Sequence, residues 1–423
     1  MAAALASARP LIPGGAPPLA IKPASVRRAI LWLFVASGCI GSIEPSPYEF
    51  MFVLTALAYA WNGLAFDRAF IPMLLCLALF EAGGLLSLAP FVAESVSVSF
   101  VATSIYVALT AIFFAALVAR DPLERMRTIR SGYVAAGVIA AALGVLAYFK
   151  VAGLGPYFTL YDNERVTGPF KDPNVFAPFL VPPIVWLAQD LLLKRGAGIF
   201  RLSALGVMLL GLFLSFSRGA WGALAASLAL LVLLTFATAQ SAAMRQRIAR
   251  LSVVGLFALV AMLALILSVG SVREMFDSRA ALGQYYDVGE LGRFGAQLRS
   301  LPMLLERPFG FGPLQFNNFF PQAPHEVYIN AFSAYGWLGG LAFVAFTAAT
   351  LYVGTRLVFQ RTPFQGDAIA VWSCLAVQMA QGFQIDTDHW RHLYLLFGVL
   401  YGLAAASRLH AARQARGLSA APS

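Results

Sequence analysis

Twelve apolar segments, most of them long enough to cross a lipid bilayer, follow one another along this chain. A helix that crosses roughly 30 Å of hydrocarbon at about 1.5 Å per residue needs about 20 residues. Of the 423 residues, 60% are hydrophobic and only 12% are charged, which excludes a cytosolic enzyme, a fibrous protein and a disordered chain. The sequence therefore predicts an all-α integral membrane protein with about twelve transmembrane helices. The expected spans are 28–43, 47–66, 69–90, 97–119, 131–150, 174–191, 198–215, 219–239, 251–271, 327–355, 367–385 and 390–407.

The charges at the ends of these segments predict that both termini are cytoplasmic. When the ends are assigned alternately to two sides, with the N-terminus inside, 20 of the 30 basic residues fall inside and 14 of the 20 acidic residues fall outside. Such an excess of lysine and arginine marks the cytoplasmic side of multi-pass proteins. The net charge of +10 is therefore a signal of topology, and no nucleic-acid partner is expected.

The chain is expected to form a single polytopic membrane domain at 27–408. A disordered cytoplasmic tail at 1–26 precedes this domain, and a second cytoplasmic tail at 409–423 follows it. Two periplasmic loops, 151–173 and 272–326, are longer than a turn. In the second loop apolar residues recur at helical spacing, so we expect a helix or two lying across the outer mouth of the protein. These residues are Leu291, Phe294, Leu298, Leu301 and Leu305.

The sequence lacks the usual patterns of a metal or nucleotide site. Cys39, Cys76 and Cys374 lie inside apolar runs, where cysteine acts as a small hydrophobic side chain. There is no Cys–His metal spacing, P-loop or dinucleotide fingerprint, so we expect neither a metal nor a cofactor. Glu81 is the one ionisable residue well inside a span, whereas proton-coupled transporters usually need several. We therefore expect Glu81 to be a hydrogen-bonded packing residue.

Polar residues gather instead where spans end at the outer face. Arg218 follows the seventh span between Ser217 and Gly219, and Arg293 lies in a glycine-rich part of the long loop. His325 lies where that loop re-enters the membrane, and its ordinary pKa of about 6.5 allows it to accept a proton near neutral pH. Each residue also has a plain structural alternative, since arginines extend to lipid headgroups and interfacial histidines form hydrogen bonds.

Two further groups lie at the same face. Arg165, Lys171 and Asn174 surround a Gly-Pro turn that can bind an anion or a sugar hydroxyl, although Asn174 is equally a natural N-cap for the sixth span. A charged cluster at the last outer turn is interpreted first as an ion-pair network that closes the outer face. This cluster comprises Asp386, Asp388, His389, Arg391 and His392.

Together these patterns resemble the O-antigen ligase and polymerase superfamily of bacterial membrane glycosyltransferases. The resemblance runs from about residue 160 to 400, and one departure is that Glu326 follows His325 where the family usually has asparagine. It rests on four patterns: the Gly-x-x-x-(Asn/Asp)-Pro-Asn-like turn within Arg165 to Asn174; Ser217-Arg218-Gly219-Ala220-Trp221; Gly292-Arg293 followed by Pro308-Phe309-Gly310-Phe311-Gly312; and His325 with Tyr328 and Gly336.

The resemblance implies an O-antigen ligase-like, inverting-type and metal-independent enzyme of the bacterial inner membrane. Such an enzyme moves a glycan from undecaprenyl pyrophosphate to a hydroxyl of lipid A–core at the periplasmic face. Arg218 and Arg293 would hold the pyrophosphate, and His325 would be the catalytic residue beside the reacting groups. Further candidates for substrate binding are Arg165, Lys171, Asn174, Asp388 and His389.

Two alternatives stay open. An O-antigen or exopolysaccharide polymerase uses the same donor chemistry with another glycan as acceptor. A transporter or flippase for a lipid-linked oligosaccharide belongs to a different class, and it predicts polar residues along a path through the membrane rather than at one face. The expected partners are the lipid-linked glycan donor, the acceptor and the lipid bilayer.

Overall fold

The computed structural model describes residues 23–160, 165–193, 198–280, 289 and 292–416, and these residues are mostly helical. A helix coincides with each of the twelve apolar segments. Eight of these helices are long and apolar enough to cross a membrane, which confirms an all-α membrane protein, whereas the count of twelve spans stays a prediction. The eight are α3 with its flanking 3-10 turns (Arg68–Phe91), α4 (Ser95–Arg120), α5 (Pro122–Tyr148), α7 (Pro173–Leu192), α9 (Arg218–Thr238), α10 (Ala242–Leu267), α13 (Val327–Val358) and α15 (Arg391–Ala415).

The remaining elements are shorter. Four apolar helices have between 14 and 17 residues, namely α1 (Pro23–Ser37), α2 (Pro47–Ala60), α8 (Ile199–Leu214) and α14 (Gln365–Gln381). Most of the predicted tails, 1–22 and 417–423, lies outside the described residues, and α15 continues to Ala415 beyond the predicted boundary at 408.

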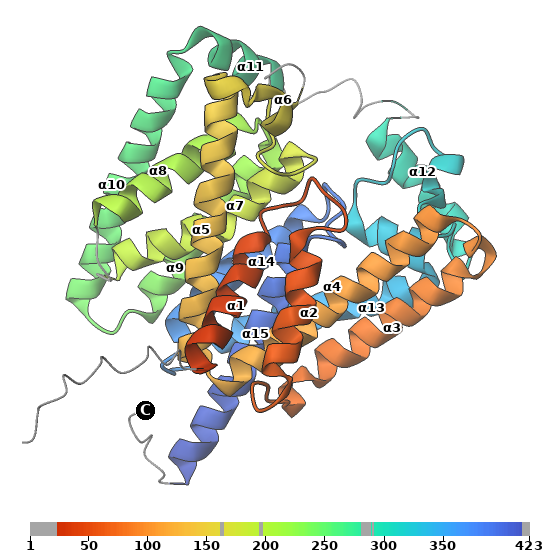
Figure 1. Cartoon of the computed structure of the whole chain (residues 1–423), viewed down its shortest axis with the longest axis horizontal. Coiled ribbons are helices and arrows are strands. Elements are labelled where there is room, and N and C mark those ends of the chain that lie inside the picture. The colour runs from red at the N-terminus through yellow and green to blue at the C-terminus, as the bar shows by residue number, and fades with distance from the viewer. Residues whose placement is uncertain (1–22, 161–164, 194–197, 281–288, 290–291, 417–423) are drawn as a thin grey trace, which may run out of the picture.

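The helices pack in pairs that are distant in sequence. Helix α13 runs along α3, and α15 runs along α4 (Figure 1). The second pair is close because Gly398 and Gly402 face α4: a Cβ atom on Gly398 would lie 2.3 Å from the Ala111 carbonyl oxygen, and one on Gly402 would lie 2.8 Å from that of Ala115. Small residues spaced by four let membrane helices approach in this way.

Prolines inside α7 leave backbone carbonyls that another helix must satisfy. Pro182 has no N–H to donate to the carbonyl of Pro178, four residues earlier. The side-chain amide of Gln378 in α14 donates to that carbonyl instead, at 2.9 Å, and Gln378 is fully buried. This bond attaches α14 to α7 in the middle of the protein.

Helix α10 has the surface expected of a helix in contact with lipid. Its most apolar stretch contains no buried residue, and Phe257 and Leu265 are 70% and 72% exposed. In water such a surface would aggregate, whereas in hydrocarbon it has no cost.

The two ends of the helix bundle differ. Figure 1 shows α6 (Gly155–Phe158), α11 (Gly270–Ala280) and α12 (Arg293–Leu305) towards one end and the C-terminal part of α15 at the other. In the first half of α5, Arg130 forms ion pairs with Asp190 at 2.8 Å and Asp367 at 2.9 Å. This arrangement agrees with the expected grouping of the two long loops at the outer face, and the assignment of sides stays a prediction.

Both long loops contain ordered structure. In the first, a short antiparallel hairpin of β1 (Thr159–Leu160) and β2 (Arg165–Val166) was not predicted from the sequence. In the second, the predicted helix is confirmed as α12, and this helix continues through Pro302. A small separate core holds the second loop together; it contains Ala296, Leu304, Phe311, Phe316 and Phe320.

Candidate functional site

The turn between α8 and α9 sets the position of Arg218. Ser217 is the N-cap residue of α9, and Phe216 before it has a left-handed φ of 50°. Arg165 holds this turn through its Nε, which donates to the Ser215 carbonyl at 3.0 Å. Its Nη2 donates to Asn174 Oδ1, near the start of α7, at 3.1 Å. Arg165 is only 8% exposed. These bonds make Arg165 and Asn174 a brace between the β1–β2 hairpin, the start of α7 and the turn before Arg218.

The predicted N-cap of α7 is wrong by two residues. Asp172, rather than Asn174, is the N-cap, and its carboxylate accepts a hydrogen bond from the backbone N–H of Asn174 at 2.7 Å. Since a carboxylate satisfies the exposed N–H groups of a first turn as well as an amide does, Asn174 is left to accept from Arg165.

The loop between α14 and α15, residues 382–390, lies against the first residues of α9 and α12. A Cβ atom placed on Gly219 would lie 3.2 Å from Gln381 Nε2 and 3.5 Å from Gln384 Oε1. Arg293, the first residue of α12, donates from Nη1 to the Gln384 carbonyl at 3.4 Å, and its guanidinium lies over the Phe294 ring. Arg218 and Arg293 therefore begin two helices that meet at Gln384.

The same loop contacts His325. His325 has a left-handed φ of 47°, which is a strained conformation for a residue with a side chain. Its Nδ1 lies 4.0 Å from Asp386 Oδ2, while Asp386 Oδ1 accepts the backbone N–H of Glu326 at 3.0 Å. His325 is 47% exposed and Asp386 is 26% exposed, so both side chains are open to a ligand.

Glu326 has a structural task that accounts for its departure from the His-Asn pattern. It is the N-cap of α13, and its two carboxylate oxygens accept the backbone N–H groups of Tyr328 and Ile329 at 3.1 and 2.5 Å. The acid beside the His325 ring is Asp386, which the sequence placed only within a general ion-pair cluster.

The glycine-rich segment of the long loop docks onto a break in α13. Gly336 has a φ of 66°, which interrupts the helix, and the carbonyl of Ser333 accepts from the backbone N–H of Phe311 at 2.8 Å. The backbones approach so closely that a Cβ atom on Gly310 would lie 2.3 Å from the Ser333 oxygen. Two of the sequence patterns thus fit together and fix the loop that leads to His325.

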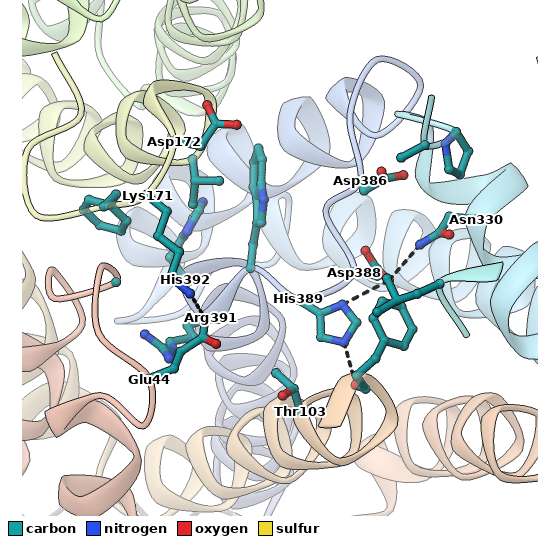
Figure 2. A pocket seen from close by; sticks show the side chains of 18 of the residues that line it. Glu44, Thr103, Lys171, Asp172, Asn330, Asp386, Asp388, His389, Arg391 and His392 are labelled. Carbon is teal, nitrogen blue, oxygen red and sulfur yellow. Dashed lines mark hydrogen bonds and ion pairs between the residues drawn. The ribbon is translucent and has the colours of Figure 1, made fainter. Parts of the chain in front are cut away.

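A cavity of about 390 Å³ is lined by Asp386, whose carboxylate lies 4.0 Å from His325 Nδ1 (Figure 2). Lys171, Asp388 and His389 all line it, as do Asp386 and Pro324. Lys171 forms an ion pair with Glu44 at 2.8 Å, and Arg391 pairs with Glu49. The charged cluster at 386–392 is thus divided into separate ion pairs rather than forming one network.

His389 has an acceptor oxygen beside each ring nitrogen, which favours its charged form. Its Nδ1 lies 3.1 Å from Asp388 Oδ2, and its Nε2 lies 3.0 Å from the Phe100 carbonyl. A neutral imidazole would turn a lone pair towards one of these oxygens. Burial alone would lower the pKa of His389, but the charge and hydrogen bond of Asp388 outweigh it and raise the pKa. Asn330 also donates to Asp388 Oδ2, at 3.1 Å.

The pKa values of the carboxylic acids near His325 are also raised, which for an acid disfavours the charged form. Burial, together with the charge of Asp388, raises the pKa of Asp386 to about 7. Burial also raises the pKa of Glu326, although the two N–H groups of α13 partly oppose this shift. Asp386 therefore changes its charge near neutral pH, close to the histidine that the resemblance implies is catalytic.

The predicted site residues fall into three neighbouring sets. Arg293 and His325 contact the 382–390 loop, Arg218 precedes Gly219, which lies close to that loop, and Arg165 with Asn174 brace the turn before Arg218. Lys171, Asp388 and His389 line the cavity. Within the described residues, no group of three or more His, Cys, Asp or Glu side chains is placed to hold a metal ion.

Comparison with known proteins identifies one family. The model of the O-antigen ligase family matches residues 203–344, about a third of the chain, and this segment includes Arg218, Arg293 and His325. No curated protein matches this sequence. The family match confirms the resemblance of this chain to the O-antigen ligase superfamily and indicates a membrane glycosyltransferase of the ligase or polymerase type.

Proposed function

We propose that this protein is an O-antigen ligase-like glycosyltransferase that moves a glycan from undecaprenyl pyrophosphate to a hydroxyl of lipid A–core at the periplasmic face of the inner membrane. The observation that carries this proposal is that Arg293 and His325 contact one loop, residues 382–390, and that the first turn of α9, which begins with Arg218, lies close to the same loop. Arg218 and Arg293 begin helices that contact Gln384, and Asp386, two residues further on, lies beside His325.

The two arginines hold the pyrophosphate. A guanidinium binds phosphate oxygens through two parallel N–H groups, and the first turn of a helix adds backbone N–H groups and a partial positive charge. Because negative charge grows on the bridging oxygen as the sugar–phosphate bond breaks, these groups stabilise the transition state more than the bound donor.

His325 activates the acceptor. The acceptor oxygen forms a bond to the anomeric carbon, its proton passes to His325, and the bond from that carbon to the phosphate oxygen breaks. Undecaprenyl pyrophosphate leaves with the electron pair. A single displacement of this kind inverts the configuration at the anomeric carbon, and general-base assistance contributes about 10²–10⁴-fold. Asp386 orients the imidazole and stabilises its protonated form.

A transfer assay in proteoliposomes tests the proposal. The assay contains undecaprenyl-pyrophosphate-linked glycan with EDTA, and either lipid A–core or excess donor serves as acceptor. We expect transfer to lipid A–core by the wild type, and none by His325→Ala or Arg293→Ala. Arg307→Gln is the matched control, because Arg307 lies in the same loop but stacks on Phe311 and Phe319.

The alternatives predict other results. Lengthening of the glycan with donor alone identifies a polymerase. Absence of transfer to either acceptor, with movement of the lipid-linked glycan across the bilayer, identifies a flippase. A metal-dependent reaction, abolished by EDTA and restored by a divalent cation, contradicts the arginine mechanism.

A further inference from the structure

The cavity beside Asp386 has the walls of a sugar-binding site. Its volume of about 390 Å³ falls within the usual range for small-molecule sites, about 300–1,000 Å³. Flat aromatic side chains suit the C–H faces of sugar rings, while carboxylate and amide groups bind hydroxyls. The aromatic residues that line the cavity are Phe100, Phe170, Phe179, Phe316 and Trp390.

Polar groups line the cavity on two sides, and the acidic group Asp386 and Asp388 lies next to Asn330. Figure 2 shows Asp386, Asp388 and Asn330 together on one side and Lys171, Arg391 and Glu44 on the other. The hydrogen bonds from Asn330 and His389 both go to Asp388 Oδ2, and no group among the described residues donates to Oδ1. Asp388 lines the cavity and is fixed through Oδ2, which leaves Oδ1 as a hydrogen-bond acceptor.

The charges of the cavity leave a surplus of carboxylate. Lys171 is paired with Glu44, Arg391 with Glu49, and His389 with Asp388. Asp172 and Asp386 also line the cavity, Asp386 being charged above its pKa of about 7, and the described cations of the wall pair with other acids. A phosphorylated sugar or a uronic acid would meet uncompensated negative charge in a partly enclosed space, which is strongly unfavourable.

We propose that this cavity is the acceptor subsite and that it takes an uncharged sugar, whose reactive hydroxyl is directed past Asp386 to His325. This inference rests on the proposed glycosyl transfer, and it adds the class of acceptor sugar. Arg218 and Arg293 are not among the residues that line the cavity, so the donor pyrophosphate and the acceptor sugar would bind at separate places.

A cavity-filling variant tests the location. Thr103 of α4 lines the cavity away from His325, and its hydroxyl bonds only within its own helix, to the Ser99 carbonyl. Thr103→Trp fills the space, whereas Thr103→Val keeps its size. The probes are maltose, lactose, cellobiose and chitobiose, each compared with its 1-phosphate, and binding to the full chain in lipid nanodiscs is measured by calorimetry.

We expect at least one neutral disaccharide to bind, with at least tenfold weaker binding of its phosphate. Thr103→Trp should weaken binding of the neutral sugar at least tenfold, and Thr103→Val should leave it unchanged. Equal or tighter binding of the phosphates, binding that survives Thr103→Trp, or no binding of any neutral probe overturns the inference.

The transfer assay separates this inference from the proposed function. If the acceptor KM rises in Thr103→Trp while the donor KM stays constant, the acceptor subsite and the proposed glycosyltransferase are both supported. If Thr103→Trp transfers glycan with an unchanged acceptor KM, the cavity is not the acceptor subsite, whereas the proposed glycosyltransferase activity still stands. Disaccharide binding that depends on Thr103, without any transfer by the wild type, overturns the proposed enzyme and leaves a saccharide site.

Discussion

The charge of Asp386 is the most direct test of how His325 works. Asp386→Asn keeps an oxygen that accepts the backbone N–H of Glu326, and it replaces the negative charge 4.0 Å from His325 Nδ1 by a neutral amide. The start of α13 should therefore survive, while the protonated imidazole that forms in the transition state loses its counter-charge. We expect the rate of transfer to fall and binding of the donor to stay the same.

The size of the effect follows from the geometry. Two unit charges 4 Å apart interact by about 4 kcal/mol at an effective dielectric constant of about 20. Because His325 is 47% exposed and Asp386 26% exposed, solvent screens the pair, and about 1–2 kcal/mol remains. This free energy corresponds to a decrease in kcat of about 5- to 30-fold.

The pH profile gives a second readout. Burial and Asp388 raise the pKa of Asp386 to about 7, so its charged form is lost as the pH falls through that value. Wild-type transfer should therefore rise between pH 6 and 8. In Asp386→Asn the acidic limb should move to lower pH, because no neighbouring charge then favours protonation of His325.

Asp172→Asn is the matched control. It removes a carboxylate from the same cavity, keeps the cap of α7, and does not contact His325. The reasoning is refuted if Asp386→Asn keeps the wild-type kcat and pH profile while His325→Ala is inactive. Asp386 would then serve only to accept backbone N–H groups.

Three other predictions concern single residues. Arg293→Lys should lower kcat/KM at least tenfold, because lysine has no planar fork for pyrophosphate, and normal transfer would contradict a bidentate role. Glu326→Gln should keep activity. Glu326→Ala should lower the stability of the protein by about 1 kcal/mol, because the cap of α13 is lost, and this loss should appear as a lower Tm. Equal Tm values for the two variants would show that the cap is unimportant. Arg130→Ala should destabilise the protein by about 3 kcal/mol, because it leaves Asp190 and Asp367 without their cation. The specific activity of the folded fraction should stay normal. A loss of that activity would assign Arg130 a role in the reaction.

The apolar spans were predictable because membrane helices are set by a local property, the length of an apolar run. Helices coincide with all twelve segments, and the helix over 293–305 follows from a repeat of apolar residues in one stretch of sequence. The β1–β2 hairpin was not predictable in the same way. Its strands have two residues each, and they are held by contacts of β2 with α5 and α8 rather than by their own pattern.

The site was predictable only in part, since residue types reveal chemistry but not spatial partners. Arginine and histidine at the outer ends of spans are conspicuous in a chain with so few charges. The role of Gln384 is invisible in the sequence, because its backbone carbonyl, which any residue supplies, accepts from Arg293. Arg165 also has the type of a ligand-binding residue, yet its burial and its bond to Ser215 make it a brace.

The departure at Glu326 shows how a sequence difference can leave the chemistry unchanged. Asparagine and aspartate are good N-caps because a short side chain carries an acceptor oxygen. Glutamate does the same work here by folding its longer side chain back onto two N–H groups of α13. The position after His325 therefore controls how the helix begins, and with it the left-handed backbone of the histidine. The partner that bears on the proton comes from Asp386, 60 residues after Glu326, so it is the 382–390 loop, rather than the adjacent residue, that sets the chemistry of His325.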